Sequence, residues 1–373
     1  MSIPMLFARG TNYEVGFQIG SVFKEKIQAG TSDVIDEVQD ILQKFGGQQL
    51  YDRYLSTAKQ VYPQYVEELQ GMADGSGVTF DKLFLNLISV ELYNMAHSAS
   101  VDVTRDTTSE GCTDLSIQTD AEVLMTHTED TFGKIKEGFL VNCQIVNPIT
   151  HLTEEHFVSY CDPGVLPSDT FGFNIHGLVM TGNTIYQRYL PCDRIARRLV
   201  NRAVLGASSL QEVCDILARE PGVGAAFNLN LGCLGSDGSD PEIYSIEFAN
   251  GDDGTLIDVQ KFGGYNYRSN TMKRLTVECN SALGPERREA RITQLATPKN
   301  ARDLLEIMSD TADAEYPIYR STTPPGVVET AAVVLFDLKR ATMSVYKGNP
   351  KENCYIPIAV LPLRFPPNPV PDI

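Results

Sequence analysis

The sequence has 373 residues, 42% of them hydrophobic, which is enough for one large α/β or α+β domain or for two smaller ones. Its 48 acidic and 31 basic residues give a formal charge of -17, which argues against nucleic acid or an anionic membrane as a partner. The sequence starts without a signal-peptide pattern and contains no run of eighteen apolar residues. We therefore expect a cytoplasmic protein without a membrane partner.

Cysteine and histidine usage argues against disulfides and metal sites. The eight cysteines stand singly, with no CxxC pair, so we expect reduced thiols. The five histidines form no HExxH motif and no paired Cys/His spacing. His127-Thr128-Glu129-Asp130 reads as the end of a strand and a turn, with His127 and Glu129 on one face and Asp130 on the other. We expect neither a zinc site nor a cofactor.

The first hundred residues show helical spacing of apolar side chains. After about residue 112 the pattern changes to short runs rich in β-forming residues, with helices returning in three places. No internal repeat and no long linker divides the chain, so we expect one structural domain of the α+β class. The predicted helices span about 14–27, 34–45, 51–72, 80 onward, 193–204, 209–220 and 286–308, and the predicted strands span 122–128, 139–146, 156–160, 171–177, 178–184, 228–235, 243–249, 256–262, 330–338 and 342–346.

The boundary between these two parts is the feature around which the rest is organised. Residues 97–111 are almost free of apolar side chains after Val103, which is typical of an exposed connection. From Cys112 to Asp120, small or apolar residues then alternate with polar ones, as in a half-buried strand. Gly111, just before the cysteine, leaves room for another group to approach its carbonyl closely.

This setting suits a nucleophile that becomes an N-terminus. In such an enzyme the thiol attacks the preceding carbonyl, the resulting ester is hydrolysed, and the freed α-amino group then serves as the base for its own side chain. An α-amino group has a pKa of about 8, so it can accept a proton near neutral pH without a histidine. The plainer interpretation is that Cys112 is a buried cysteine that only fills space.

Several motifs follow Cys112 in a fixed order. Together they resemble the family of N-terminal nucleophile hydrolases that includes acyl-coenzyme A:isopenicillin N acyltransferase, over nearly the whole chain. The opening residues 9–20 are similar to the animal branch of this family, which acts on N-β-alanyl amines. The motifs are Gly111-Cys112-Thr113 as the processing site, Asp130 eighteen residues later, GFNIHGLVMTGN at 172–183, Arg268-Ser269-Asn270, and the segments at 316–320 and 330–350.

The resemblance implies a four-layer αββα sandwich, with residues 1–111 as a helical small fragment and 112–373 as the catalytic fragment. It implies that Cys112 is nucleophile and, through its amine, base. Asn270 would donate its side-chain amide to the oxyanion, and Asp130 and Arg320 would form a charged pair that orders the α-amino group. An ordinary structural ion pair is the alternative for these last two residues.

The sequence also departs from the acyltransferase pattern. Asp114 replaces a hydroxyl residue two positions after the cysteine, and Arg268 and Thr271 replace the histidines that flank the asparagine. Since residues i and i+2 of a strand share a face, we expect Asp114 to lie beside Cys112 and to bind a cationic acyl group such as β-alanyl. The alternative is that Asp114 only orders the new N-terminal ammonium.

The sequence therefore predicts a self-cleaving cysteine amidohydrolase that removes a small acyl group, β-alanyl above all, from an amine such as dopamine or histamine. Its partners would be the small amide substrate and its own two fragments. Acyl transfer from coenzyme A or an amide to an amine is the second hypothesis. An uncleaved, non-catalytic binding protein is a third. The oligomeric state stays open, and a homo-oligomer is one of the states the sequence allows.

Overall fold

The fold was determined as a computed structural model that describes residues 3–100, 111–132, 137–188, 191, 193–235, 239–280, 283–321 and 328–365. Most of the predicted exposed connection before Gly111 and most of the proline-rich tail lie outside these residues. The remainder forms a mixed α+β structure with two β-sheets.

The N-terminal region is helical, but its helix boundaries differ from the prediction: α2 runs without a break from Lys24 to Phe45, through the predicted gap at 28–33. The predicted helix at 51–72 is interrupted at Tyr62, because Pro63 has no backbone N–H and begins a new helix at its N1 position. Thr11 and Glu14 form a capping box that starts the first helix. The helices are α1 Asn12–Val22, α2 Lys24–Phe45, α3 Gly47–Val61, α4 Pro63–Ser76, α5 Phe80–Leu87 and α6 Ser89–Ser98.

Helices α1 and α4 cross with their backbones in contact. A Cβ atom added to Gly16 would lie 1.9 Å from the carbonyl oxygen of Glu68, and one added to Gly71 would lie 2.0 Å from that of Tyr13. Only glycine permits so close an approach at these positions. The crossing fixes α1, which in turn packs beside strand β1.

The larger sheet has eight strands in the order β1-β4-β5-β6-β7-β8-β9-β10. Its first strand comes from the start of the chain and pairs in parallel with β4, from beyond Cys112. Sequence periodicity did not predict β1, because it lies at the sheet edge and its inner residues do not form a continuous apolar run. The strands are β1 Met5–Gly10, β4 Phe139–Val146, β5 Thr153–Cys161, β6 Gly172–Asn174, β7 Leu178–Thr184, β8 Phe227–Cys233, β9 Glu242–Gly251 and β10 Gly254–Lys261.

The smaller sheet has six strands in the order β11-β2-β3-β12-β13-β14. Strand β3 continues to Phe132, so His127 to Asp130 lie within a strand rather than in the predicted turn. The strands are β2 Gly111–Gln118, β3 Val123–Phe132, β11 Gly264–Arg268, β12 Val328–Asp337, β13 Thr342–Tyr346 and β14 Ala359–Pro362.

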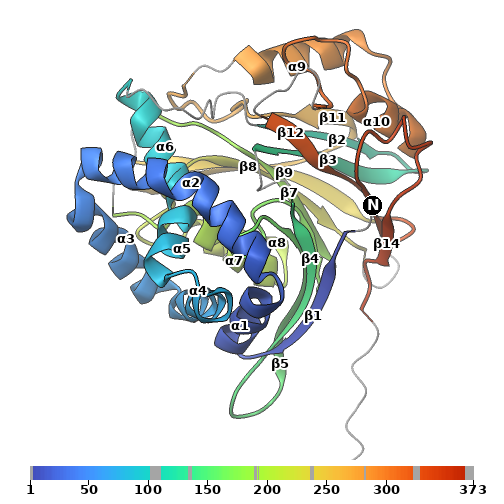
Figure 1. The fold of residues 1–373 in the computed structure, drawn as a ribbon. Helices are drawn as coiled ribbons and strands as arrows, with labels where there is room; N and C mark the ends of the chain where they lie inside the picture. Colours follow the sequence, from blue (N-terminus) through green and yellow to red (C-terminus); the bar gives the residue numbers. More distant parts are fainter. Residues whose placement is uncertain are drawn as a thin grey trace, which may run out of the picture.

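The three largest of the four hydrophobic clusters among the described residues hold the sheets and helices together. One joins the N-terminal helices, α7 (Arg197–Gly206) and α8 (Leu210–Leu217) to the larger sheet. A second contains side chains of both sheets, among them Met125 and Leu140. The third packs α9 (Leu283–Gln294) and α10 (Ala301–Met308) on the smaller sheet. Figure 1 shows the corresponding arrangement, with blue helices beside the larger sheet and orange helices over the smaller one.

A buried ion pair links the helices before Cys112 to the elements after it. Arg202 of α7 donates to both carboxylate oxygens of Glu68 in α4, at 3.0 Å and 2.8 Å, and to Glu155 in β5 at 2.7 Å. Arg202 and Glu68 are fully buried. Removing either partner would leave an uncompensated charge in the interior, so this contact joins the two regions firmly.

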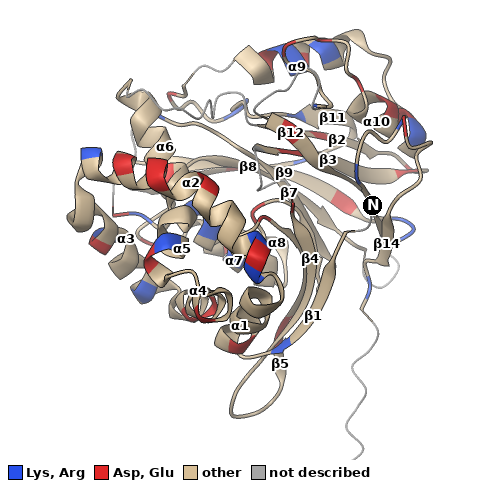
Figure 2. Ribbon diagram, in the orientation of Figure 1, with Lys and Arg blue, Asp and Glu red and all other residues tan. Residues whose placement is uncertain are grey.

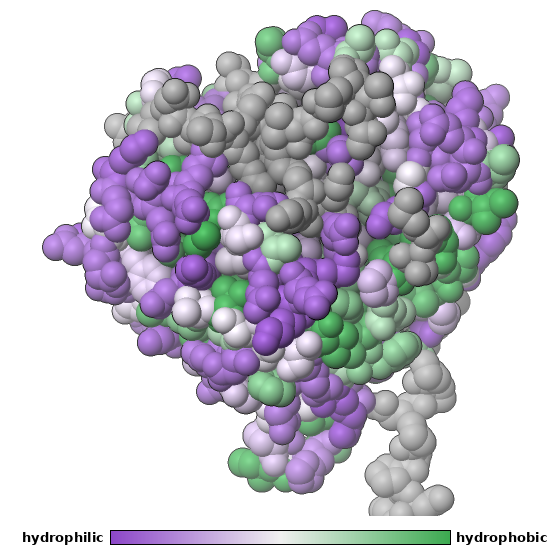
Figure 3. Space-filling view, viewed as in Figure 1, coloured by the Kyte–Doolittle hydropathy of each residue, from purple (hydrophilic) through white to green (hydrophobic). Residues whose placement is uncertain are grey.

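Charged residues are spread over the surface helices, as Figure 2 shows for both helical regions. Figure 3 shows hydrophilic residues over much of the same face, with hydrophobic ones gathered toward β1 and β14. Both strands carry an exposed hydrophobic side chain, Phe7 on β1 and Val360 on β14, with exposed fractions of 72% and 56%. Among the helices that the structure describes, none is long and apolar enough to cross a membrane.

Replacing Gly16 by alanine should destabilise the protein by about 2–3 kcal/mol, because the new methyl group would force the α1 and α4 backbones apart. Denaturant unfolding followed by circular dichroism measures the change. Gly263→Ala is the matched control, since an added Cβ meets nothing within 4 Å there. Equal stability of the two variants would show that the helix crossing tolerates a side chain.

Candidate active site

The candidate site lies where strands β2 and β3 pair between the two sheets. The antiparallel register sets Gly111 opposite Asp130, Cys112 opposite Glu129, and Asp114 opposite His127. Because side chains alternate along a strand, the last two pairs share one face. Leu115 and Ile117, further along β2, point the other way, into the core under α9 and α10.

Backbone and side-chain contacts hold Cys112 in place. Its backbone N–H donates to Oδ1 of Asn270 at 3.1 Å, and its carbonyl accepts from Nη1 of Arg288 at 2.8 Å. Arg288 Nη2 also donates to Asn270 Oδ1 at 2.7 Å, and the Asn270 amide nitrogen donates to the carbonyl of Thr184 at 3.0 Å. Two donors at Oδ1 fix which way the Asn270 amide is turned, so its NH₂ group faces the Thr184 side.

Gly111 is packed directly against these two residues. A Cβ atom at this position would lie 2.2 Å from Arg288 Nη2 and 2.5 Å from Asn270 Oδ1. Position 111 therefore requires a glycine, because any side chain there would displace Arg288 and Asn270, which hold Cys112.

The thiol belongs to a line of buried ionisable groups. Cys112 Sγ lies 3.7 Å from Glu129 Oε2, which lies 3.1 Å from Nε2 of His127. The other ring nitrogen, Nδ1, lies 3.0 Å from Asp114 Oδ2. Asp114 also accepts from the hydroxyl of Thr181 at 2.5 Å and from the amide of Asn183 at 2.7 Å, both in β7.

Burial and neighbouring charges shift the pKa of each group in this line. Burial, together with the Glu129 carboxylate, raises the pKa of the Cys112 thiol to about 12. Burial also raises the pKa of Glu129, against the effect of His127. For His127, burial lowers the pKa, but the Asp114 carboxylate outweighs it and leaves the pKa well above its ordinary value.

Asp130 and Arg320 are close enough to form the predicted ion pair. Asp130 Oδ2 lies 3.4 Å from Arg320 Nε, and Asp130 Oδ1 accepts from the hydroxyl of Thr330 at 2.6 Å. Both charged residues are buried, with exposed fractions of 3% and 7%. Burial raises the pKa of Asp130 despite the nearby Arg320 and Arg288. The pair stands beside Gly111, which Asp130 faces across the strands.

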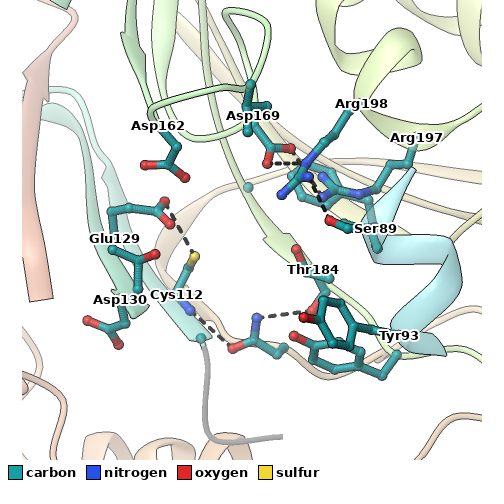
Figure 4. Close-up of a pocket in the computed structure, with 18 of the residues that line it drawn as sticks. Ser89, Tyr93, Cys112, Glu129, Asp130, Asp162, Asp169, Thr184, Arg197 and Arg198 are labelled. Carbon is teal, nitrogen blue, oxygen red and sulfur yellow. Dashed lines mark hydrogen bonds and ion pairs between the residues drawn. The ribbon is translucent and has the colours of Figure 1, made fainter. Parts of the chain in front are cut away.

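A pocket of about 90 Å³ opens in front of Cys112. Figure 4 shows Glu129 and Asp162 on the thiol side, with Asp169, Arg198 and Ser89 across the space. Asp169 contacts Arg198 Nε at 2.7 Å and Arg197 Nη2 at 3.1 Å. The other lining residues include the aromatic side chains Tyr93, Tyr186 and Phe227, and the predicted site residues Asp130 and Asn270.

The ligand atoms of Cys112, His127 and Glu129 all lie within 4.8 Å of one another. One thiolate, one imidazole and one carboxylate are donors that zinc accepts, and the Asp114–His127 contact is of the kind that orients a zinc-bound histidine. The sequence spacing did not reveal this grouping, because the residues meet through strand pairing. The same three side chains are also joined by the contacts from Cys112 to Glu129 and from Glu129 to His127.

The structure thus brings Cys112, Asp130, Asn270 and Arg320 to one place. Asp114 shares the expected face with Cys112, but its carboxylate is engaged by His127, Thr181 and Asn183 and is not among the groups that line the pocket. Three further residues, His127, Glu129 and Arg288, were not predicted as site residues. For the first two, the shared strand face was a usable signal; for Arg288, nothing in the local pattern pointed to the site.

Comparison with known proteins adds two findings. The model of the family described as "Acyl-coenzyme A:6-aminopenicillanic acid acyl-transferase" matches residues 117–352, well over half of the chain. The chain belongs to this acyl-transferase family. It is also 30% identical, over 96% of its own length and 96% of the relative's, to a β-alanyl-dopamine/carcinine hydrolase of Drosophila melanogaster. The family match includes Asp130, Asn270 and Arg320 and begins five residues after Cys112.

Replacing Asp169 by asparagine should destabilise this acyl-transferase family member by about 3–5 kcal/mol at pH 7, since the buried Arg197 and the half-buried Arg198 would lose their shared carboxylate. Burial raises the pKa of Asp169, but Arg198 and Arg197 outweigh it and hold the pKa below its usual value. A lowered pKa gives stability that is present above the unfolded-state value of about 3.9 and is lost as pH falls through the folded-state value. Urea unfolding of the wild type and the variant from pH 7 to pH 3 should show that their difference in free energy of unfolding narrows below about pH 4. A difference that stays constant with pH would contradict the role of the Asp169 carboxylate.

Proposed function

We propose that the chain is a self-cleaving cysteine amidohydrolase that removes a β-alanyl group from a biogenic amine such as dopamine or histamine. The observation that carries the proposal is the setting of Cys112, whose amide, carbonyl and thiol each have a fixed partner at the mouth of a pocket. The likeness to a hydrolase of β-alanyl-dopamine and carcinine supports the reaction and the substrate class.

We also propose the four-layer αββα arrangement of N-terminal nucleophile hydrolases for the fold. It is supported by the three hydrophobic clusters, one between helices and the larger sheet, one containing residues of both sheets, and one between the smaller sheet and α9 with α10. In this arrangement the nucleophile stands at the end of a strand between the sheets. The position of Cys112 near the start of β2 fits that expectation.

Turnover begins when the Cys112 thiol gives its proton to its own freed α-amino group and attacks the amide carbonyl of the substrate. The Asn270 amide donates to the oxyanion that forms, which is worth about 3 kcal/mol of transition-state stabilisation. The protonated amino group then passes its proton to the leaving amine. A thioester remains on Cys112, and water hydrolyses it to release β-alanine.

Two arginines have supporting roles in this mechanism. Arg288 keeps the Cys112 carbonyl and Asn270 Oδ1 at fixed positions, so that the asparagine presents its NH₂ group to the oxyanion. Arg320 neutralises Asp130, and this pair orders the α-amino group that cleavage releases. The Asp130 carboxylate is one of the charges that raise the pKa of the Cys112 thiol. These roles follow the original sequence-based expectation for Asn270, Asp130 and Arg320.

For substrate recognition we assign Asp162 to the β-alanyl ammonium. Asp162 lines the pocket on the same side as Cys112 and Glu129, whereas Asp114 is committed to His127. The aromatic ring of the amine would lie toward Tyr93 and Tyr186, with its polar groups near Arg198. Asp114 then acts through His127 rather than by contact with the substrate.

Acyl transfer remains the second candidate, because the family model that matches is named for an acyl-transferase. Both reactions pass through the same thioester and differ only in whether water or an amine resolves it. The ratio of free acid to new amide, measured with a competing amine present, separates them. Dominant amide formation would favour transfer over hydrolysis.

The expressed chain should split after Gly111 into fragments of 111 and 262 residues that stay associated. The shared core and the Glu68–Arg202 pair would hold them together. Intact mass and N-terminal sequencing test the site of cleavage.

Cys112→Ala should give a folded, uncut and inactive chain. Cys233 is a half-buried thiol away from the pocket, so Cys233→Ala should still be cut. A mature fragment that starts anywhere other than Cys112 would refute the nucleophile assignment.

Asp162→Asn should lower kcat/KM for β-alanyl amides ten- to a hundredfold more than for uncharged propionyl amides. A charge-assisted hydrogen bond to an ammonium is worth about 1.5–3 kcal/mol, which gives this ratio. Asp114→Asn is the comparison variant and should reduce both activities equally, since it acts through His127. Selective loss in the Asp114 variant, with equal losses in the Asp162 variant, would restore Asp114 as the substrate-binding carboxylate.

A further inference from the structure

Self-cleavage has a requirement that turnover does not share. In the mature enzyme the free α-amino group of Cys112 is the base for the thiol, but in the uncut chain that nitrogen is part of the Gly111–Cys112 peptide bond. It donates its hydrogen to Asn270 Oδ1 at 3.1 Å and has no basic lone pair. The first cleavage therefore needs another group to accept the thiol proton.

Among the groups that the structure describes around Cys112, Glu129 is placed to do this. Its Oε2 atom lies 3.7 Å from Sγ, within reach of an S–H hydrogen bond, and directly opposite Cys112 in the strand register. Glu129 is 8% exposed, so bulk water has little access to the contact. A carboxylate in such surroundings is a stronger base than one in water.

His127 and Asp114 hold Glu129 in position. The two ring nitrogens of His127 lie 3.1 Å from Glu129 and 3.0 Å from Asp114, so a protonated ring donates to both carboxylates. Thr181 and Asn183 fix Asp114 from the facing sheet. His127 is completely buried between them. Its positive charge lies near the thiol and stabilises a thiolate as it forms.

We propose that Glu129, positioned by His127 and Asp114, is the catalytic base that removes the Cys112 thiol proton in self-cleavage, before the α-amino group exists. This inference rests on the proposed function. It assigns two different bases to one nucleophile: Glu129 in the uncut chain and the Cys112 amine afterwards. The pKa of about 12 for the thiol explains why a base is needed at all, since the thiolate is scarce at neutral pH.

The bonds and protons balance in two steps. First, the Cys112 S–H proton moves to Glu129, the thiolate attacks the Gly111 carbonyl carbon, and the Gly111–Cys112 C–N bond breaks. Glu129 returns the proton to the departing nitrogen, which leaves a thioester and a free amine. Second, a water molecule attacks the thioester, and the new amine accepts the proton of the water. The amine then passes this proton to the departing sulfur, which restores the thiol. The products are the thiol, the Cys112 amine and the Gly111 carboxylic acid, which releases its proton to solvent at neutral pH.

The test is a pulse-chase of the full chain made by cell-free synthesis, with the cleaved fraction followed on gels. Glu129→Gln should slow cleavage about a hundredfold or more, since a general base typically contributes 10²–10⁴ in rate. Glu129→Asp, which keeps the charge, should cleave faster than the glutamine variant and slower than the wild type. Glu154→Gln, an exposed glutamate on β5, is the matched control and should cleave at the wild-type rate.

Two measurements distinguish a base from a structural residue. Hydroxylamine, which cleaves thioesters, should not release fragments from Glu129→Gln, because the thioester has not formed. The loss of cleavage rate in Glu129→Asp should also exceed the loss of kcat/KM per cleaved chain by at least tenfold, since the α-amine serves turnover. If Glu129→Gln lacks a cooperative unfolding transition, the aspartate variant decides the question.

The outcomes separate this proposal from the proposed function. Cleavage of Glu129→Gln within threefold of the wild-type rate would overturn the role of Glu129 and leave the hydrolase proposal intact. Release of fragments by hydroxylamine from that variant at the wild-type rate would overturn it too, because the acyl shift would then precede the action of Glu129. A wild-type chain that never cleaves would overturn both.

Discussion

The contact of Gly111 with Arg288 and Asn270 is the constraint on which the site depends. With no side chain at this position, Asn270 can reach the N–H of the Gly111–Cys112 peptide and Arg288 can reach the carbonyl of the Cys112–Thr113 peptide. Arg288 is itself completely buried, and burial together with Arg320 lowers its pKa to about 10. Its two Nη atoms donate to the Cys112 carbonyl, the Thr113 hydroxyl and Asn270 Oδ1, and these bonds fix the backbone that the guanidinium contacts.

The same strand pairing gathers charge that the interior would otherwise exclude. Asp114, His127 and Glu129 are all buried, and each is tolerable because the next group in line accepts or donates a hydrogen bond. Because burial disfavours its charged form, Glu129 has a raised pKa and lies beside the thiol as a proton acceptor. Perturbed pKa values of this kind cluster at functional sites, and the pocket of aromatic and charged residues opens at the same point.

The path of the chain explains how a cut between Gly111 and Cys112 is compatible with a stable protein. Strand β1 lies in the sheet that β4 to β10 build, and α4 shares a buried ion pair with α7 and β5. The N-terminal helices also share a core with the larger sheet. The segments on either side of the cysteine are thus held by contacts that do not run through the peptide bond between them.

How much the sequence predicts depends on the range of the interaction involved. Apolar spacing predicted most helices and strands, and Gly111-Cys112 at the start of an alternating run pointed to the proposed nucleophile, because these are properties of neighbouring residues. The alternation of side chains along a strand also predicted that His127 and Glu129 share one face. Tertiary structure alone decided that this face meets Cys112, that Asp114 is taken by Thr181 and Asn183, and that Arg288, 176 positions away, holds the Cys112 carbonyl. Strand partners and register are non-local, since many pairings satisfy the same local pattern and only packing of the whole chain selects one.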